Sequence, residues 1–179
     1  MFARHRDFFL RIVAEFARSP WCVVLATGHL PVAALGVLPD NIVAYQWIPQ
    51  LRVLRHADVF LTHGGMNSVQ EATVSGVPML LAPRVREQRL TARRVVSLSL
   101  GARMSRTKSL RDQVEWLSEG ALADRRVCDA CALSTPARAA WVDRPTLSGL
   151  RLGYVQLAAL RTAAAWPAVS MVRVQRHFI

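Results

Sequence analysis

The side chains of His63, Asn67 and Ser68 lie around a pair of glycines, and this arrangement can bind an anion. The preceding run Asp58–His63 (DVFLTH) is typical of a short buried strand, and a helical pattern begins after the glycines. Glycine lets the backbone approach a ligand closely, and the free N–H groups in the first turn of a helix point toward an anion. We therefore expect an anion site where this strand passes into the helix.

Two further polar clusters lie at similar junctions, Trp47–Gln50 (WIPQ) upstream and Glu87–Gln88 downstream. Each follows an apolar run that is typical of a strand, and Pro49 suits the first turn of a helix. The carboxyl ends of parallel strands meet at one edge of a sheet, where ligands bind in open α/β folds. The three clusters together therefore predict a single ligand crevice.

Each cluster also has an ordinary structural explanation. Ser68-Val-Gln-Glu71 has the S-x-x-E spacing of a capping box, which would do no more than start a helix. Trp47 could be a core residue, Gln50 a turn residue and Glu71 a capping residue. One cluster alone would not decide between these explanations and a ligand site, whereas three in succession favour the site.

Taken together, the clusters resemble the donor-binding signature of nucleotide-sugar glycosyltransferases of the GT-B type, which contain two Rossmann-like domains. That signature contains W-x-P-Q, a strand ending in T-H-x-G, an S-x-x-E helix, G-V-P, and a proline followed by an acid–Gln pair. The resemblance covers about Phe2 to about Leu133 and is greatest for the bacterial macrolide glycosyltransferases, akin to the erythromycin biosynthesis protein CIII-like C-terminal domain. The matching residues are Trp47, Pro49, Gln50, Thr62, His63, Gly65, Ser68, Glu71, Gly76, Val77, Pro78, Pro83, Glu87 and Gln88.

The resemblance implies a role for each part of the signature. Trp47 would stack on the nucleobase, usually uracil, and the backbone of Ile48 would read the edge of the base. Gln50 and Glu71 would bind the ribose hydroxyls, since a carboxylate accepts from two neighbouring hydroxyls. The diphosphate would be bound by His63, Gly65, Asn67 and Ser68, and the sugar hydroxyls by Glu87 and Gln88.

Two positions depart from the macrolide branch. Arg84 stands where glutamine is common, and Thr91 stands where asparagine is common. Several more arginines make this segment unusually basic. The resemblance therefore does not predict which sugar the site selects.

The resemblance also implies a reaction. A sugar would pass from a UDP- or dTDP-sugar to a hydroxyl of a small-molecule acceptor, with inversion and without a metal or cofactor. The catalytic base would come from an acceptor-binding domain outside this chain, so no residue here is assigned a catalytic role, and the isolated chain is expected to be inactive. Three alternatives stay open: a half-enzyme that pairs with a separate acceptor-domain protein, a nucleotide-sugar-binding module without catalysis, and a remnant without function.

The alternation of strand-like and helical patterns predicts an α/β fold, a Rossmann-like parallel sheet with flanking helices. We expect helices at 5–18, 50–57, 87–100, 110–117 and 121–133, and strands at 21–27, 41–46, 58–63, 79–82 and 102–104. The resemblance implies a further strand before the first helix. Without it, the middle of the sheet would contain a gap. We expect residues 1–133 to form the nucleotide-sugar-binding domain and residues 134–179 a divergent or poorly ordered tail.

The composition limits which binding partners and which cellular compartment we expect. The formal net charge is +11, but the arginines are scattered and no nucleic-acid-binding motif accompanies them, so nucleic acid is not an expected partner. No apolar run approaches the roughly 18 residues of a membrane span. The three cysteines include the pair Cys128 and Cys131, which has no second pair to complete a zinc site. Such sparse cysteine usage favours a reducing cytoplasm.

Overall fold

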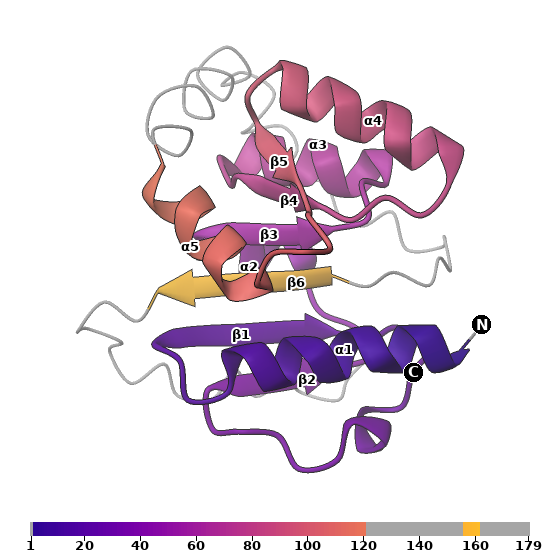
Figure 1. Ribbon diagram of the computed structural model, residues 1–179, viewed down its shortest axis with the longest axis vertical. Coiled ribbons are helices and arrows are strands. Elements are labelled where there is room, and N and C mark those ends of the chain that lie inside the picture. The colour runs from indigo at the N-terminus through magenta and orange to yellow at the C-terminus, as the bar shows by residue number, and fades with distance from the viewer. Residues whose placement is uncertain (1, 121–155, 162–179) are drawn as a thin grey trace.

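The computed structural model describes residues 2–120 and 156–161. These residues form a six-stranded sheet with helices on both faces (Figure 1). The alternating strands and helices predicted from the sequence are confirmed, with ends that differ by a few residues. The elements are α1 (Phe2–Phe16), β1 (Trp21–Ala26), the 3-10 helix η1 (Val32–Leu35), β2 (Ile42–Tyr45), α2 (Gln50–Leu54), β3 (Val59–Thr62), α3 (Met66–Ser75), β4 (Met79–Leu81), α4 (Arg86–Ser97), β5 (Gly101–Arg103), α5 (Leu110–Glu119) and β6 (Gln156–Arg161).

The strand order across the sheet is β2-β1-β6-β3-β4-β5. The pairs β1–β2, β3–β4 and β4–β5 are parallel, as expected for a Rossmann-like fold. Strand β6 lies between β1 and β3 and runs antiparallel to both. Figure 1 shows its arrow reversed between those two neighbours.

Strand β6 corrects one expectation from the sequence, that the middle of the sheet would contain a gap. It pairs with β1 over its whole length, from Trp21 opposite Arg161 to Ala26 opposite Gln156. It also pairs with β3, with Thr62 opposite Gln156. A segment near the carboxyl end of the chain therefore supplies the ladder partners that two central strands need.

Helices cover the two faces of the sheet with separate apolar clusters. On β3, Val59 and Leu61 face the cluster formed with α1 and α5, whereas Phe60 faces the cluster formed with α3 and α4. Strand β4 repeats the alternation, since Leu80 belongs to the first cluster and Met79 to the second. Both faces of these strands are buried, which explains why the runs are apolar throughout rather than alternating.

Glu15 ties α1 to α5. One oxygen of its carboxylate accepts hydrogen bonds from the backbone N–H groups of Leu110 and Arg111 and from the hydroxyl of Ser109. The other oxygen forms an ion pair with Arg11 at 2.6 Å. Partial burial works to raise the pKa of Glu15, but the hydrogen bonds from Arg11, Leu110 and Arg111 outweigh it and lower the pKa. A negative charge thus caps the positive end of α5 from the neighbouring helix.

Several expectations concern residues that the structure does not describe. The helix at 121–133, the Cys128 and Cys131 pair and the domain boundary after Leu133 lie outside the described residues. Among the helices of residues 2–120, none is both long enough and apolar enough to cross a membrane.

Candidate functional site

Three of the predicted site segments lie at the same edge of the sheet. Trp47 follows the carboxyl end of β2, His63 follows β3, and Glu87 and Gln88 lie at the start of α4, which follows β4. The parallel pairing of β3 and β4 continues to Ala82, whose N–H donates to the carbonyl of Thr62 at 2.8 Å. The turns after the two strands are therefore neighbours, as the sequence predicts.

The turn after β3 requires both of its glycines. Gly64 has a φ of 86°, in the left-handed region, and its N–H donates to the hydroxyl of Thr62 at 3.3 Å. A Cβ at Gly65 would lie 2.7 Å from Nε2 of His63. The backbone at the start of α3 therefore lies directly against the imidazole, with no room for a side chain between them.

The first turn of α3 corrects the capping-box explanation. The N-cap is Gly65, so Ser68 is the third residue inside the helix, and it is buried. Asn67 is exposed in the same turn. The N-cap position itself is a glycine, which has no side chain to cap the N–H groups at the start of α3. A helix that starts directly after a glycine turn is the geometry expected of an anion site.

His63 is neutral at pH 7. Its side chain is only 6% exposed. Burial, followed by the positive charge of Arg84, lowers the pKa of His63 to about 4. A neutral imidazole can donate one hydrogen bond and accept another, while Arg84 supplies a full positive charge at the same place.

Gln50 and Glu71 are in direct contact. The Nε2 group of Gln50 donates to Oε2 of Glu71 at 2.6 Å, and both residues are partly buried. Burial raises the pKa of Glu71, and the hydrogen bond from Gln50 opposes that rise. Gln50 is the first residue of α2 and Glu71 lies within α3, so neither is only a turn residue or a cap.

Trp47 is not a core residue, because its side chain is 59% exposed. It lies in the connection from β2 to α2 beside Ile48, which is half-buried. The imidazole of His29 stands nearly perpendicular to the indole, with ring centroids 5.8 Å apart. Trp47 therefore presents a flat surface to solvent at the carboxyl edge of the sheet.

The predicted sugar-binding residues lie in the first turn of α4. Glu87 is exposed, whereas Oε1 of Gln88 accepts from the N–H groups of Arg84 at 2.8 Å and Val85 at 3.3 Å. A Cβ at Gly64 would come within 3.5 Å of the carbonyl oxygen of Gln88. The glycine turn after β3 and the start of α4 are therefore in contact.

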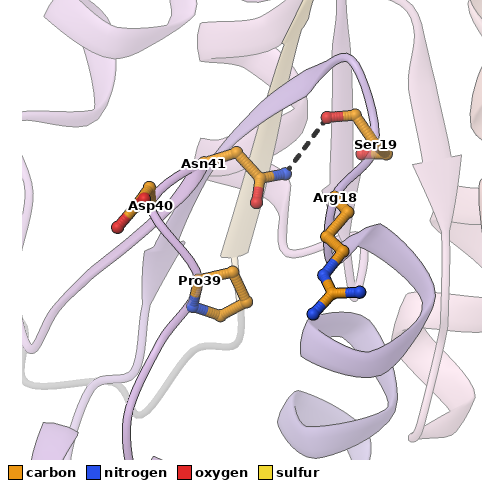
Figure 2. Close-up of a pocket in the computed structure, with 5 residues that line it drawn as sticks. All are labelled: Arg18, Ser19, Pro39, Asp40 and Asn41. Atoms are coloured by element: carbon orange, nitrogen blue, oxygen red, sulfur yellow. Dashed lines mark hydrogen bonds between the residues drawn. The ribbon is translucent and has the colours of Figure 1, made fainter.

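A pocket of about 390 Å³ lies at the other edge of the sheet (Figure 2). It is lined by Arg18 and Ser19 before β1 and by Pro39, Asp40 and Asn41 before β2. The amide of Asn41 donates to the carbonyls of Phe16, Ser19 and Trp21, so its role is to fix the α1–β1 turn. This pocket contains none of the predicted site residues.

Sequence reasoning missed His29. The residue follows β1, at the same edge as the other site residues, but it matches no signature position. Its position one residue after a glycine at the end of a buried strand was the only available signal. Arg84 was noted as a departure from the family pattern, and its effect on His63 became visible only in the structure.

Comparison with known proteins agrees with this geometry. The family model described as UDP-glucoronosyl and UDP-glucosyl transferase matches residues 12–113. The NDP-glycosyltransferase YjiC of Bacillus subtilis (strain 168) is 38% identical over 117 residues, covering 63% of this chain and 30% of that protein. The oleandomycin glycosyltransferase of Streptomyces antibioticus is 34% identical over 124 residues, covering 68% of this chain and 28% of that protein.

Solved structures give the same result. The crystal structure of CalG4, the calicheamicin glycosyltransferase, superposes with a TM-score of 0.69 and 40% identity, over 76% of this chain and 38% of that one. The glycotransferase of kitacinnamycin gives a TM-score of 0.66 and 38% identity, over 74% of this chain and 35% of that one. The chain thus spans roughly a third of the length of the proteins it resembles.

Proposed function

Because the chain belongs to the UDP-glucoronosyl and UDP-glucosyl transferase family, we propose that it forms the donor-binding part of a glycosyltransferase. The complete enzyme would move a sugar from a UDP- or dTDP-sugar to a hydroxyl of a small-molecule acceptor. One observation supports this most directly. The exposed Trp47, the Gln50–Glu71 pair and the glycine turn at the start of α3 border one edge of the sheet.

The nucleoside would bind at the end of the site formed by Trp47, Gln50 and Glu71. The exposed indole offers a stacking surface for the base, and the backbone of Ile48 follows directly beside it. The carboxylate of Glu71 can accept from two ribose hydroxyls while Gln50 fixes its orientation through the 2.6 Å hydrogen bond.

The diphosphate would bind at the start of α3. The N-cap of α3 is a glycine, Asn67 and Ser68 lie in the first turn, and His63 lies directly before the glycine pair. Arg84 adds a positive charge close to His63. In the transfer, negative charge develops on the departing diphosphate, and donors already aimed at it lower the barrier. Glu87 and the Nε2 group of Gln88 would bind the sugar hydroxyls.

The chemical step needs an acceptor and a general base, and we assign neither to this chain. The acceptor hydroxyl would attack the anomeric carbon, the base would take its proton, and the nucleoside diphosphate would leave with inversion, without a metal or cofactor. An acceptor domain would have to supply the base, either in the same polypeptide or as a separate partner protein. The proposal places the reaction in the cytoplasm, in keeping with a chain of only three cysteines.

Calorimetric titration with UDP, uridine and inorganic pyrophosphate tests the proposal. UDP should bind more tightly than uridine, because only the diphosphate reaches the start of α3. Trp47→Ala should weaken UDP binding by about 1–3 kcal/mol, the value of one stacked base, and leave pyrophosphate binding unchanged. Trp116→Ala is the matched control, since Trp116 is similarly exposed at 57% but lies on α5. Equal affinities for UDP and uridine would contradict the phosphate assignment.

A sugar-transfer assay tests whether the reaction needs an acceptor domain in addition to this chain. We expect no sugar transfer by the 179-residue chain from UDP-glucose or dTDP-sugars to phenolic or macrolide acceptors, and transfer by a form extended with an acceptor domain. Turnover by this chain alone that is abolished by His63→Ala would contradict the proposal and require a base within this sequence.

A further inference from the structure

The turn after β1 brings His29 to the side of Trp47 through backbone pairing. The N–H of Thr27 donates to the carbonyl of Tyr45 at 2.8 Å, and the N–H of Gly28 donates to the carbonyl of Gln46 at 2.9 Å. These two hydrogen bonds hold the residues directly after β1 against the last residue of β2 and the residue that follows it. The residues that follow each strand, His29 and Trp47, therefore emerge next to each other.

The turn itself is held firmly. The hydroxyl of Thr27 donates to the carbonyl of Leu30 at 2.7 Å, Gly28 adopts a φ of 61°, and both Thr27 and Leu30 are buried. His29 is the exposed residue between them. A rigid turn thus presents one imidazole at the surface, and the rigidity of the turn fixes where that imidazole stands.

The contact between the two rings is specific in its geometry. The ring centroids of His29 and Trp47 are 5.8 Å apart and the planes meet at 87°, which is an edge-to-face arrangement. Both side chains are exposed, so this contact adds little to the apolar core. An exposed indole without such a neighbour would sample several rotamers, and a ligand that needs one of them would bind more weakly.

We propose that His29 is a positioning residue of the nucleotide site, holding the indole of Trp47 in the orientation that a nucleobase stacks on. This inference rests on the proposed donor-binding function and names a residue that the signature does not contain. His29 acts through ring packing against Trp47 and not through the diphosphate, since the phosphate site lies at the turn after β3. His29 and His63 therefore have different roles at this edge. His29 orients the indole on which the nucleobase stacks, and His63 lines the phosphate site.

Binding measurements show whether His29 acts by packing its ring against Trp47 or by the charge and hydrogen bonds of its imidazole. His29→Ala should weaken UDP binding by about 3- to 10-fold, the range of one aromatic pair, and leave the affinity for inorganic pyrophosphate unchanged. His29→Phe keeps a ring against the indole and should restore the affinity for UDP to within about 2-fold of the wild-type value. His56→Ala, at an exposed histidine outside the site, is the matched control and should change neither affinity.

A double-mutant cycle gives the decisive comparison. Because His29 acts through Trp47, its removal should have no effect on UDP binding in a Trp47→Ala background. An equal loss in the wild-type and Trp47→Ala backgrounds would overturn the positioning role, as would a His29→Ala variant with full UDP affinity. A loss that His29→Phe does not restore would also overturn it, because the imidazole would then bind the ligand itself.

The indole can also be observed without ligand. With 5-fluorotryptophan incorporated in the full chain, the fluorine resonance of Trp47 should shift or broaden in His29→Ala and stay unchanged in His56→Ala. If the wild-type chain failed to bind UDP while this resonance still depended on His29, the donor-binding proposal would be contradicted. The ring contact between His29 and Trp47 would still be supported. UDP binding that depends on Trp47 and not on His29 would overturn the present inference alone.

Discussion

The amide of Gln50 donates a 2.6 Å hydrogen bond to the carboxylate of Glu71, which lies 21 residues further along the chain. This bond joins the segment after β2 to the helix after β3, and α2 packs on α3 beside it. Since β1 and β6 separate β2 from β3 in the sheet, the pair connects the base end of the site to its phosphate end. The ribose of a bound nucleotide would lie between those two ends.

Glu71→Gln should weaken UDP binding because an amide oxygen replaces a charged acceptor of two ribose hydroxyls. We expect a loss of about 1.5–3 kcal/mol, the value of hydrogen bonds to a charged group, and no change for inorganic pyrophosphate. Calorimetry with both ligands measures this. Glu115→Gln, which removes a carboxylate from an exposed ion pair on α5, is the control and should leave both affinities unchanged. Equal losses for UDP and pyrophosphate would place Glu71 at the phosphates instead.

The order of strands and helices could be predicted from the sequence because it is a local property. Apolar runs such as Asp58–His63 and the helical spacing that follows them depend on neighbouring residues alone. The site residues could be predicted because the signature fixes their spacing, and the structure places Trp47, His63 and the Gln50–Glu71 pair at one edge. Their binding roles remain predictions, which titration with UDP, uridine and pyrophosphate would test.

Two features could not be predicted, and both depend on residues far apart in the sequence. Strand β6 joins β1 through pairs such as Trp21 with Arg161, and no local pattern indicates which distant strand a short apolar segment will join. The contact of His29 with Trp47 depends on the register of β1 against β2 beyond the strand ends. Sequence spacing carries neither kind of information.

Gly65→Ala should damage the phosphate site while leaving the fold intact. The added Cβ would lie 2.7 Å from Nε2 of His63, so either the imidazole or the start of α3 must move. We expect UDP affinity to fall at least about 10-fold, because displaced N–H donors lose charge-assisted hydrogen bonds, and uridine affinity to stay unchanged. Gly36→Ala is a useful comparison, since a Cβ there meets no atom within 4 Å, although its φ of 74° adds backbone strain. Unchanged UDP binding in Gly65→Ala would contradict the phosphate assignment.

The pKa of His63 should make the stability of the domain depend on pH in mildly acidic solution. The unfolded chain takes up a proton near the ordinary pKa of 6.5, whereas the folded chain does so only near the lowered pKa of about 4. The free energy of unfolding should therefore fall by roughly 3 kcal/mol as the pH drops from 6.5 to 4. Urea unfolding at a series of pH values measures this. His63→Gln cannot titrate, so that variant should lack this part of the pH dependence.

Binding of UDP should reverse part of that pKa shift. A diphosphate beside His63 favours the charged imidazolium, so the pKa of His63 should rise from about 4 on binding and a proton should be taken up just above that pH. Calorimetry in buffers with different heats of ionisation counts these protons. The phosphate of UDP also titrates, but it does so equally in His63→Gln, so the difference between the two proteins isolates the histidine. Identical proton uptake in both would place the diphosphate away from His63.

Glu15→Gln should lower the stability of the domain without affecting ligand binding. The variant loses the ion pair with Arg11 and weakens the cap on α5 that Leu110 and Arg111 donate to. We expect a loss of about 1–2 kcal/mol at pH 7, typical of a helix cap. Because the folded pKa of Glu15 is lowered, its contribution is present above the unfolded pKa and is lost as the pH falls through the folded pKa. Wild type and variant should therefore converge in acid, and a constant difference at all pH values would contradict the role of the charge.

Removal of β6 should unfold the domain, although the strand lies far from the predicted binding residues in the sequence. The strand pairs with six residues of β1 and four of β3. Without it, both strands would keep buried N–H and C=O groups without partners, each costing about 1–3 kcal/mol. Summed over all the groups that face β6, this cost is at least as large as the roughly 5–15 kcal/mol by which a typical domain is stable.

Two truncations separate β6 from the residues around it. A chain ending at Arg161 retains the strand, and a chain ending at Val155 lacks it. We expect the first to unfold cooperatively on heating, followed by circular dichroism, and the second to show no cooperative transition. As an independent check, Ala158→Pro removes one backbone donor from a strand with neighbours on both sides and should cost about 3 kcal/mol or more. Equal melting temperatures for the two truncations would show that β6 does not hold the centre of the sheet.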